Sequence, residues 1–276
     1  KIIDNGSGDN YTLLDALKSI SVKLRRNRFK NGSLNIEIPE AEFTMGNAGI
    51  PTKISVKKYL KTHELVEEFM LLANRVIAQK FTEDNKPLIY RNHEKPEPER
   101  LIDLNGILAQ VGNYKPLSIS QKINASEFQQ VLDKVADSEV RHMIESQLLR
   151  TMAKADYSLN NKGHFGLGFE SYCHFTSPIR RYPDIIVHRA ISNIMVENAT
   201  KIASSSTQSE ISAMKAEREY NKIKQLRYLE KQPIKLYKGI VNGMTQHGLF
   251  IMLEDILVDG FIRAKWMDDD YYYFDE

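Results

Sequence analysis

The spacing of apolar residues changes once along this chain, near residue 233, and that change limits the folds open to it. Before it, apolar residues recur at helical spacing, most clearly over 63–81. After Lys235 they alternate with polar residues in short runs separated by turns: Gly239–Val241, Gly248–Ile251 and Val258–Ile262. Helices followed by a block of strands predict an α+β protein, with a helix-rich domain at 1–232 and a partial OB-fold β-barrel at 233–276.

The first domain should combine its helices with a small sheet. Further helical patterns occupy 12–30, 97–111, 125–133 and 138–154. Alternating apolar residues predict strands of a mixed or antiparallel sheet at 34–38, 53–58 and 87–90. We expect Thr12 to cap the first helix and Pro178 to open a helix that continues to Asn198. A Ser/Thr-rich link at 203–209 should precede a charged helix over 208–231.

The charge balance of the chain gives no sign of a polyanionic partner. Its 276 residues include 38 Lys and Arg against 36 Asp and Glu, a formal net charge of +2. Nucleic-acid binding would therefore come from the arrangement of the cations rather than from their total. Basic residues cluster at 23–30, at Arg180–Arg181 and at 215–231, although each cluster by itself also fits a solvated helix face.

Cysteine usage and hydropathy place the chain in a reducing compartment. Cys173 is the single cysteine, so no intrachain disulfide can form, and no Cys/His set has zinc-site spacing. No apolar run approaches the ~20 residues that span a bilayer, and residues 1–10 do not resemble a signal peptide. We infer a cytoplasmic protein with no membrane or disulfide partner. Because it starts at Lys1 and stops in the acidic aromatic run 268–276, we expect a part of a longer protein.

The stretch from Tyr157 to Pro183 lacks a clean period and is rich in Gly, His and aromatic residues, as functional loops often are. It brings together hydroxyl groups, an expected helix start at Pro178 and two adjacent guanidiniums, Arg180 and Arg181. Such groups bind phosphate oxygens, and the interleaved rings offer stacking surfaces to unpaired bases. A buried aromatic loop with structural arginines explains the same composition, so the residues alone leave both interpretations open.

The same stretch resembles the catalytic-domain signature of the RNase II/RNase R family of 3′-to-5′ exoribonucleases. The resemblance rests on Tyr172, the run Thr176-Ser177-Pro178-Ile179-Arg180-Arg181-Tyr182-Pro183-Asp184 and the later His188-Arg189. Three further segments resemble the family, in the family's order: Arg26–Ile38, His63–Asn74 and Tyr90–Pro96. The resemblance covers nearly the whole chain and implies a metal-dependent enzyme of RNA degradation that hydrolyses single-stranded RNA to nucleoside 5′-monophosphates.

The resemblance also implies roles for individual residues. Arg180 would contact the phosphates at the scissile end and stabilise the charge that develops there. Its neighbours would line the RNA channel: Tyr172, Ser177, Arg181 and Tyr182. Glu67 or Glu68 would meet a ribose hydroxyl of the 3′-terminal nucleotide, although acids at a helix start also suit the helix dipole.

Other residues of the first domain carry smaller expectations. Ile36 takes a position that is often aromatic in the family, so we expect apolar contact with RNA there in place of stacking. Asn74 is either functional or a buried hydrogen-bonding residue between a helix and a loop. His164, His174 and His188 are expected to be structural, since the family's reaction does not rest on histidine.

The metal site that the resemblance implies is not found in this sequence. In the family, a cluster of aspartates holds the Mg²⁺ ions that assist hydrolysis. No such cluster occurs in residues 1–60, and its ligands are expected upstream of Lys1. We therefore predict no metal ligand in this chain and no activity of the chain by itself. The alternative is a non-catalytic RNA-binding protein derived from the same domain, which the sequence upstream would distinguish.

The second domain resembles the opening of an S1-type OB barrel, an RNA-binding module. The resemblance rests on Lys238–Val241 and Gln246–Leu253. It implies that His247, Phe250 and Lys265 lie on the RNA-facing surface. A helical domain joined to an unrelated barrel, with no RNA affinity, is the second alternative.

Overall fold

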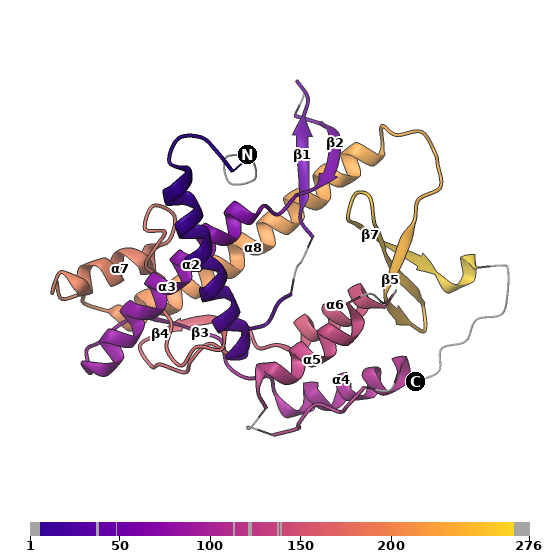
Figure 1. The fold of residues 1–276 in the computed structure, drawn as a ribbon. Helices are drawn as coiled ribbons and strands as arrows, with labels where there is room; N and C mark the ends of the chain where they lie inside the picture. Colours follow the sequence, from indigo (N-terminus) through magenta and orange to yellow (C-terminus); the bar gives the residue numbers. More distant parts are fainter. Residues whose placement is uncertain are drawn as a thin grey trace. The chain divides into compact units, whose positions relative to one another are not determined.

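The computed structural model describes residues 6–36, 39–47, 49–112, 114–120, 123–136, 138 and 140–267 (Figure 1). The helices are α2 (Tyr11–Lys30), α3 (Lys61–Glu83), α4 (Pro98–Val111), α5 (Ala125–Val135), α6 (Arg141–Thr151), α7 (Tyr182–Ile191) and α8 (Ala199–Leu229). The strands are β1 (Ala41–Met45), β2 (Pro51–Val56), β3 (Tyr90–Asn92), β4 (Asp156–Ser158), β5 (Gly239–Thr245), β6 (Gly248–Leu253) and β7 (Val258–Arg263). Two short 3₁₀ helices are η1 (Phe165–Leu167) and η2 (Ala264–Trp266).

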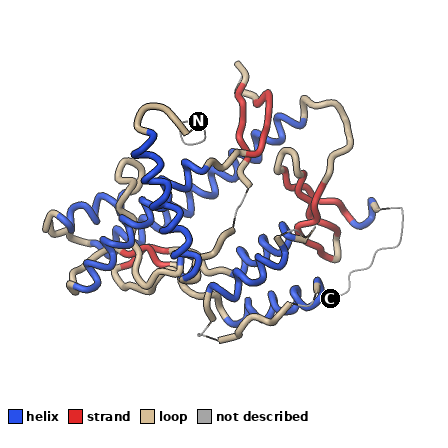
Figure 2. The backbone as a smooth tube through the Cα atoms, viewed as in Figure 1, coloured by secondary structure: helices blue, strands red, loops and turns tan. Residues whose placement is uncertain are grey.

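Helices and small antiparallel sheets alternate along the chain, which confirms the predicted α+β class (Figure 2). Contacts divide the chain into two compact units, each built from segments that are distant in sequence. Unit 1 contains Lys1–Asn35, Tyr59–Val131 and Thr151–Glu210, and unit 2 contains Ile36–Lys58, Leu132–Arg150 and Ile211–Glu276. The predicted domain boundary at residues 232 and 233 stays a prediction. Of the helices described, none combines the length and apolar character needed to cross a membrane.

The core of unit 1 is built where α3 and α7 meet the segment before β3. Ala78 of α3 and Val187 of α7 are buried against Leu88, Tyr90 and the free thiol of Cys173. The 23-residue α3 contains neither Gly nor Pro, so nothing in its sequence interrupts it. β3 pairs with β4 in antiparallel register, Arg91 opposite Tyr157. This arrangement fixes both ends of the 157–183 stretch to the core.

Helix α4 supplies a second buried face in unit 1. Leu101, Leu104 and Leu108 recur at spacings of three and four and are buried, while Pro98 stands in the first turn, where its missing N–H costs no hydrogen bond. The loop after α4 is tied back to it, because Asn105 accepts from Leu117 N (2.7 Å) and donates to Leu117 O (2.9 Å).

Unit 2 contains the β1–β2 hairpin and the three-stranded sheet β5–β6–β7. In β1–β2, Phe43 lies opposite Ile54; in the larger sheet, Phe250 lies opposite Phe261. The apolar cluster of this unit joins Ile54 to residues of the end of α8, of the sheet and of the segments beside the strands, namely Tyr228, Leu229, Tyr237, Leu253, Ile256 and Val258. In the part of the chain that the structure describes, β5–β7 form an open antiparallel sheet and do not close into a barrel.

Several local expectations are corrected where tertiary contacts override sequence signals. Thr12 is not the N-cap: the chain enters α2 through Asn10 at φ 61°, which places Thr12 inside the first turn. Leu34 lies outside any strand, because its N–H donates to Gly166 O (2.9 Å) in a loop. Ile38, from the same predicted strand, lies outside the described residues. The strand expected at 87–90 begins only at Tyr90.

The two helices after the motif also differ from expectation. Pro178 lies in a turn, and α7 starts four residues later at Tyr182 and ends at Ile191 rather than near residue 198. The Ser/Thr-rich run is not a link but part of α8. There, Thr207 Oγ accepts from Tyr157 N (3.0 Å) and donates to Ala203 O (3.1 Å), so packing against β4 outweighs the weak helix propensity of Ser and Thr.

Candidate functional site

Residues 176–181 form the loop before α7, called the motif loop below, and one buried carboxylate holds it. Asp184, in the first turn of α7, has 0% of its surface exposed. Its Oδ1 accepts from the backbone N–H of Ser177 (2.7 Å) and from Nη2 of Arg181 (2.8 Å). The N–H groups of Arg180 and Arg181 both donate to Ser177 O, at 3.3 and 3.1 Å. The turn from 177 to 181 is therefore closed by hydrogen bonds at both ends.

The two adjacent guanidiniums have different surroundings. Arg181 is mostly buried and paired with Asp184, and its Nε has no partner among the described residues. Arg180 is exposed, and no carboxylate among the described residues pairs with it. Tyr182 is also exposed, at the first position of α7. The loop thus presents the free guanidinium of Arg180 beside the accessible ring of Tyr182, while Arg181 holds the loop to Asp184.

Tyr172 lies beneath this loop rather than on its surface. It is 5% exposed, and its hydroxyl accepts from Nδ2 of Asn74 (2.9 Å). Asn74 Oδ1 in turn accepts from Phe175 N (3.0 Å), and its backbone carbonyl accepts from the thiol of Cys173 (3.3 Å). The ring of Tyr172 therefore contacts its own chain more than the surface, and its place in an RNA channel stays a prediction. Asn74 has the structural role that the sequence left as one alternative.

Two partly buried histidines, His164 and His174, are neutral. Burial, with the nearby Arg181 and Arg91, lowers the pKa of His174 to about 2, and burial lowers the pKa of His164 to about 3. Tyr157 Oη lies 2.8 Å from Nδ1 of His174. Because neither histidine can gain a proton near neutral pH, their surroundings favour the structural role expected of them.

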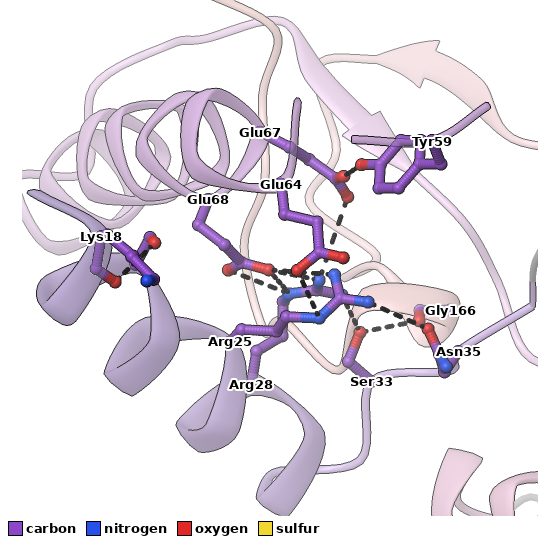
Figure 3. Close-up of polar contacts among 11 residues, drawn as sticks. Lys18, Arg25, Arg28, Ser33, Asn35, Tyr59, Glu64, Glu67, Glu68 and Gly166 are labelled. Carbon is purple, nitrogen blue, oxygen red and sulfur yellow. Dashed lines mark hydrogen bonds and ion pairs between the residues drawn. The ribbon is translucent and has the colours of Figure 1, made fainter. Parts of the chain in front are cut away.

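A network of arginines and glutamates joins α2 to the start of α3 (Figure 3). The buried guanidinium of Arg28 contacts Glu68 through Nε (3.2 and 3.3 Å) and Nη2 (2.5 Å), and its Nη1 donates to Ser33 Oγ (2.6 Å). Ser33 Oγ reaches the backbone carbonyl of Gly166 (3.4 Å). Arg25 lies at 3.7 Å from Glu64 and 3.8 Å from Glu68. This network ties the Gly-rich segment 163–168 to α2 and α3.

The same network distinguishes the two glutamates that the sequence left as alternatives. Glu68 is 3% exposed and is fully engaged by Arg28, so it holds the fold together. The side chain of Glu67 is 41% exposed, and one of its oxygens accepts from the hydroxyl of Tyr59, while the other lies 3.9 Å from Nη2 of Arg28 (Figure 3). Glu67 is therefore the one with a carboxylate oxygen available to a ligand.

The remaining predicted RNA contacts lie in unit 2. Ile36 is partly buried, His247 is exposed in the turn between β5 and β6, and Lys265 is exposed in η2. Phe250 of β6 is 46% exposed, and its ring centroid lies 4.9 Å from that of Phe261 on β7. Sequence analysis missed Phe261; its place in the run predicted as a strand was the available signal.

A cavity lies beside the Gly-rich segment 163–168 of unit 1. Its volume is about 690 Å³, and it is lined in part by Lys30, Lys95 and Lys162. Within the described residues, no group of three or more His, Cys, Asp or Glu side chains could hold a metal ion. The residues that the structure describes therefore do not fit the Mg²⁺ ions that the sequence resemblance implies.

The RNB domain family model matches residues 4–197, which include α2 to α7 and the motif loop. The chain belongs to the RNB domain family. Ribonuclease R of Thermotoga maritima is 34% identical over 268 residues, covering 92% of this chain and 37% of that protein. Ribonuclease R of Escherichia coli is 31% identical over 283 residues, covering 95% of this chain and 34% of that protein. The chain thus spans about a third of these relatives' length.

Solved structures show the same RNB fold. Mycoplasma genitalium RNase R in complex with ribose-methylated single-stranded RNA has a TM-score of 0.89 and 27% identity, over 99% of this chain and 46% of that chain. Yeast Ssd1, described as a pseudonuclease, has a TM-score of 0.70 over 95% of this chain and 34% of that chain; at 17% identity it shows the fold alone. The resemblance found in the sequence is thereby confirmed at the level of the family.

Proposed function

We propose that this RNB chain is the RNA-handling part of a 3′-to-5′ exoribonuclease that hydrolyses single-stranded RNA to nucleoside 5′-monophosphates. The observation that carries the proposal is the exposed, unpaired guanidinium of Arg180 on a turn closed by the buried Asp184. An arginine held in this way meets a phosphate without first giving up a carboxylate partner. The relatives named ribonuclease R, which match nearly the whole chain, support the assignment.

Each residue near the turn has a distinct part in the proposal. Arg180 is the catalytic residue, donating to the phosphoryl oxygens on which negative charge grows in the transition state. Tyr182 offers its exposed ring to a base. Ser177 and Arg181 are positioning residues, because the backbone N–H of Ser177 and Nη2 of Arg181 both donate to Asp184 and hold the turn. Tyr172 supports the turn from below through Asn74.

Glu67, rather than Glu68, is proposed to meet a ribose hydroxyl of the 3′-terminal nucleotide. Its exposed carboxylate oxygen can accept a hydrogen bond from a hydroxyl that DNA lacks. The hydroxyl of Tyr59 holds the other oxygen and so limits the rotation of the carboxylate. The engaged Glu68 has no free acceptor to offer without breaking its pair with Arg28.

Metal dependence is part of the proposal for the full protein and not of the chemistry assigned to this chain. Two Mg²⁺ ions would activate the attacking water and stabilise the leaving oxygen. Since the described residues do not fit such ions, every role given above is limited to binding, orientation and charge stabilisation.

A non-catalytic RNA-binding protein is the second candidate, because the structure of a pseudonuclease has this fold too. Single-turnover hydrolysis of a 5′-labelled RNA by the full-length protein separates the candidates. We expect processive shortening from the 3′ end, and we expect Arg180→Ala to lower the maximal single-turnover rate about 10²–10³-fold. The protein concentration that gives half of that rate should change little. Arg26→Ala, an exposed arginine on α2, is the matched control. An undiminished rate in Arg180→Ala would remove Arg180 from the mechanism, and RNA binding without cleavage by the wild type would favour the second candidate.

A further inference from the structure

Unit 1 contains a hollow of about 320 Å³, called the slot below, between the end of α3, the segment before β3 and the connection from α7 to α8. Its volume lies near the lower end of the range of about 300–1,000 Å³ that is typical of small-ligand pockets. None of the described residues that line it has a part in the proposed function. The slot is therefore a second candidate site within the same unit.

The floor of the slot is apolar and nearly closed to water. Leu88 belongs to the apolar cluster around Ala78, and Ile89 and Ile186 belong to a second cluster of unit 1. Leu88, Ile89 and Ile186 are each at most 4% exposed, although all three line a hollow. The opening is therefore narrow, and it admits an unbranched chain more readily than a folded polypeptide segment.

The mouth of the slot has apolar side chains that remain in contact with water. Helix α7 is followed by Asn193 at φ 56°, and the N–H of Ile194 donates to Arg189 O (2.9 Å). An apolar residue placed after such a left-handed cap usually packs back onto the helix. Here Ile194 is 55% exposed and Met195 is 92% exposed, and both line the slot. This exposed apolar surface favours an apolar ligand, because covering it releases the water around it.

The mouth also has a positive charge. Of the described residues that line the slot, Lys86 alone is charged. Its Nζ lies 3.5 Å from Oδ2 of Asp84, and Nζ of Lys80 lies 2.9 Å from Oδ1 of the same carboxylate. Two ammonium groups thus share one carboxylate, which leaves a positive charge in excess. The other acids close in sequence, Glu83 and Glu197, do not line the slot.

We propose that the slot binds a free monocarboxylate of the fatty-acid class, with its acyl chain on the apolar floor and its carboxylate at Lys86. The amide of Asn193, which also lines the slot, can donate to the same carboxylate. An uncharged lipid would leave the excess positive charge without a partner, and a polyanion would have to place charge against apolar walls. The proposal does not rest on the proposed function, because it uses none of the residues assigned to RNA.

Isothermal titration calorimetry of the full-length protein with hexanoate, octanoate and decanoate tests the apolar part of the slot. Each added methylene should tighten binding about fourfold for as long as the chain finds room. Octanol, which has the same chain and no charge, tests the head group. Because Lys86 is half exposed, the wild type should prefer octanoate to octanol by up to about fivefold.

Two substitutions at the mouth locate the ligand. Lys86→Gln should lose the preference for octanoate over octanol and keep the dependence on chain length. Lys61→Gln removes a lysine from the opposite end of α3 and should retain both properties. Met195→Glu places a like charge at the mouth, so it should bind octanoate up to about fivefold more weakly than the matched variant Met195→Gln. Met195 is almost fully exposed, so both of its variants should melt with the wild type.

The results separate the parts of the proposal. Affinity that does not rise with chain length overturns the apolar slot. Equal affinity of the wild type for octanoate and octanol overturns the assignment of a carboxylate. A dependence on chain length that is the same in Lys86→Gln and Met195→Glu as in their controls overturns the slot as the place of binding. The variants should shorten RNA as the wild type does, so the proposed function is tested separately.

Discussion

Replacing Glu68 by alanine tests whether the neighbouring glutamates of α3 have different roles. Glu68 is buried and engages Arg28 through three contacts between 2.5 and 3.3 Å. In Glu68→Ala, the buried guanidinium keeps the hydroxyl of Ser33 at 2.6 Å and the carboxylate of Glu67 at 3.9 Å. A charge with that little compensation in a buried position is unfavourable, so the variant should be strongly destabilised.

The expected size follows from the burial of the two glutamates. Removing one member of a buried ion pair costs about 3–5 kcal/mol. With an unfolding entropy of about 2.1 cal/mol/K per residue and 276 residues, that loss lowers Tm by roughly 5–9 °C. Glu67 is substantially exposed, and exposed pairs contribute about 0–1 kcal/mol, so Glu67→Ala should melt close to the wild type.

Differential scanning calorimetry of four proteins checks this reasoning: wild type, Glu67→Ala, Glu68→Ala and the double variant Arg28→Met/Glu68→Leu. The double variant removes both charges and should recover most of the lost stability, since apolar pairs replace buried ion pairs well. The Arg28–Glu68 pair does not have the structural role assigned to it if Glu68→Ala has the same Tm as Glu67→Ala. The same holds if the Tm of the double variant is no higher than that of Glu68→Ala.

Three further predictions concern unit 1. The partly buried His164 and His174 have folded-state pKa values of about 3 and about 2, below the unfolded value of about 6.5. Unfolding therefore takes up protons below pH 6.5, and each histidine should lower the free energy of unfolding by about 1.4 kcal/mol per pH unit as the pH falls further. Urea titrations at pH 7 and pH 5 measure this loss. Equal stability at the two pH values would contradict the view that both histidines are neutral in the folded protein. Gly168 has φ +64°, and an added Cβ would lie 2.8 Å from Asn31 O. Gly168→Ala should therefore lower the free energy of unfolding by at least about 1–2 kcal/mol in the same assay. Unchanged stability would show that the loop can shift to accept the side chain. Burial raises the pKa of the Cys173 thiol to about 12. The thiol should therefore resist a thiol reagent at pH 8 in the native protein and react with it in urea. Rapid labelling of the native protein would show that the core opens.

Local sequence patterns were sufficient to predict α3 and the last three strands of this RNB chain. The apolar period over 63–81 predicted α3, and the change of period after Lys235 predicted β5 to β7. The motif from Thr176 to Asp184 was sufficient for the family, because nine chemically varied residues in order rarely match by chance. These signals depend only on neighbours in the chain, which is why they could be read without coordinates.

Tertiary structure decided the role of each residue within those signals. Arg180 and Arg181 are identical in sequence terms, but only Arg181 lies where Asp184 can reach it. Glu67 and Glu68 are equally acidic, but adjacent residues on a helix point in directions about 100° apart, so Glu68 hydrogen-bonds the buried Arg28 at 2.5 Å while Glu67 stays 3.9 Å from it. Burial and pairing depend on segments far apart in the chain, and these long-range contacts determine which of two like charges holds the fold and which is free to meet a ligand.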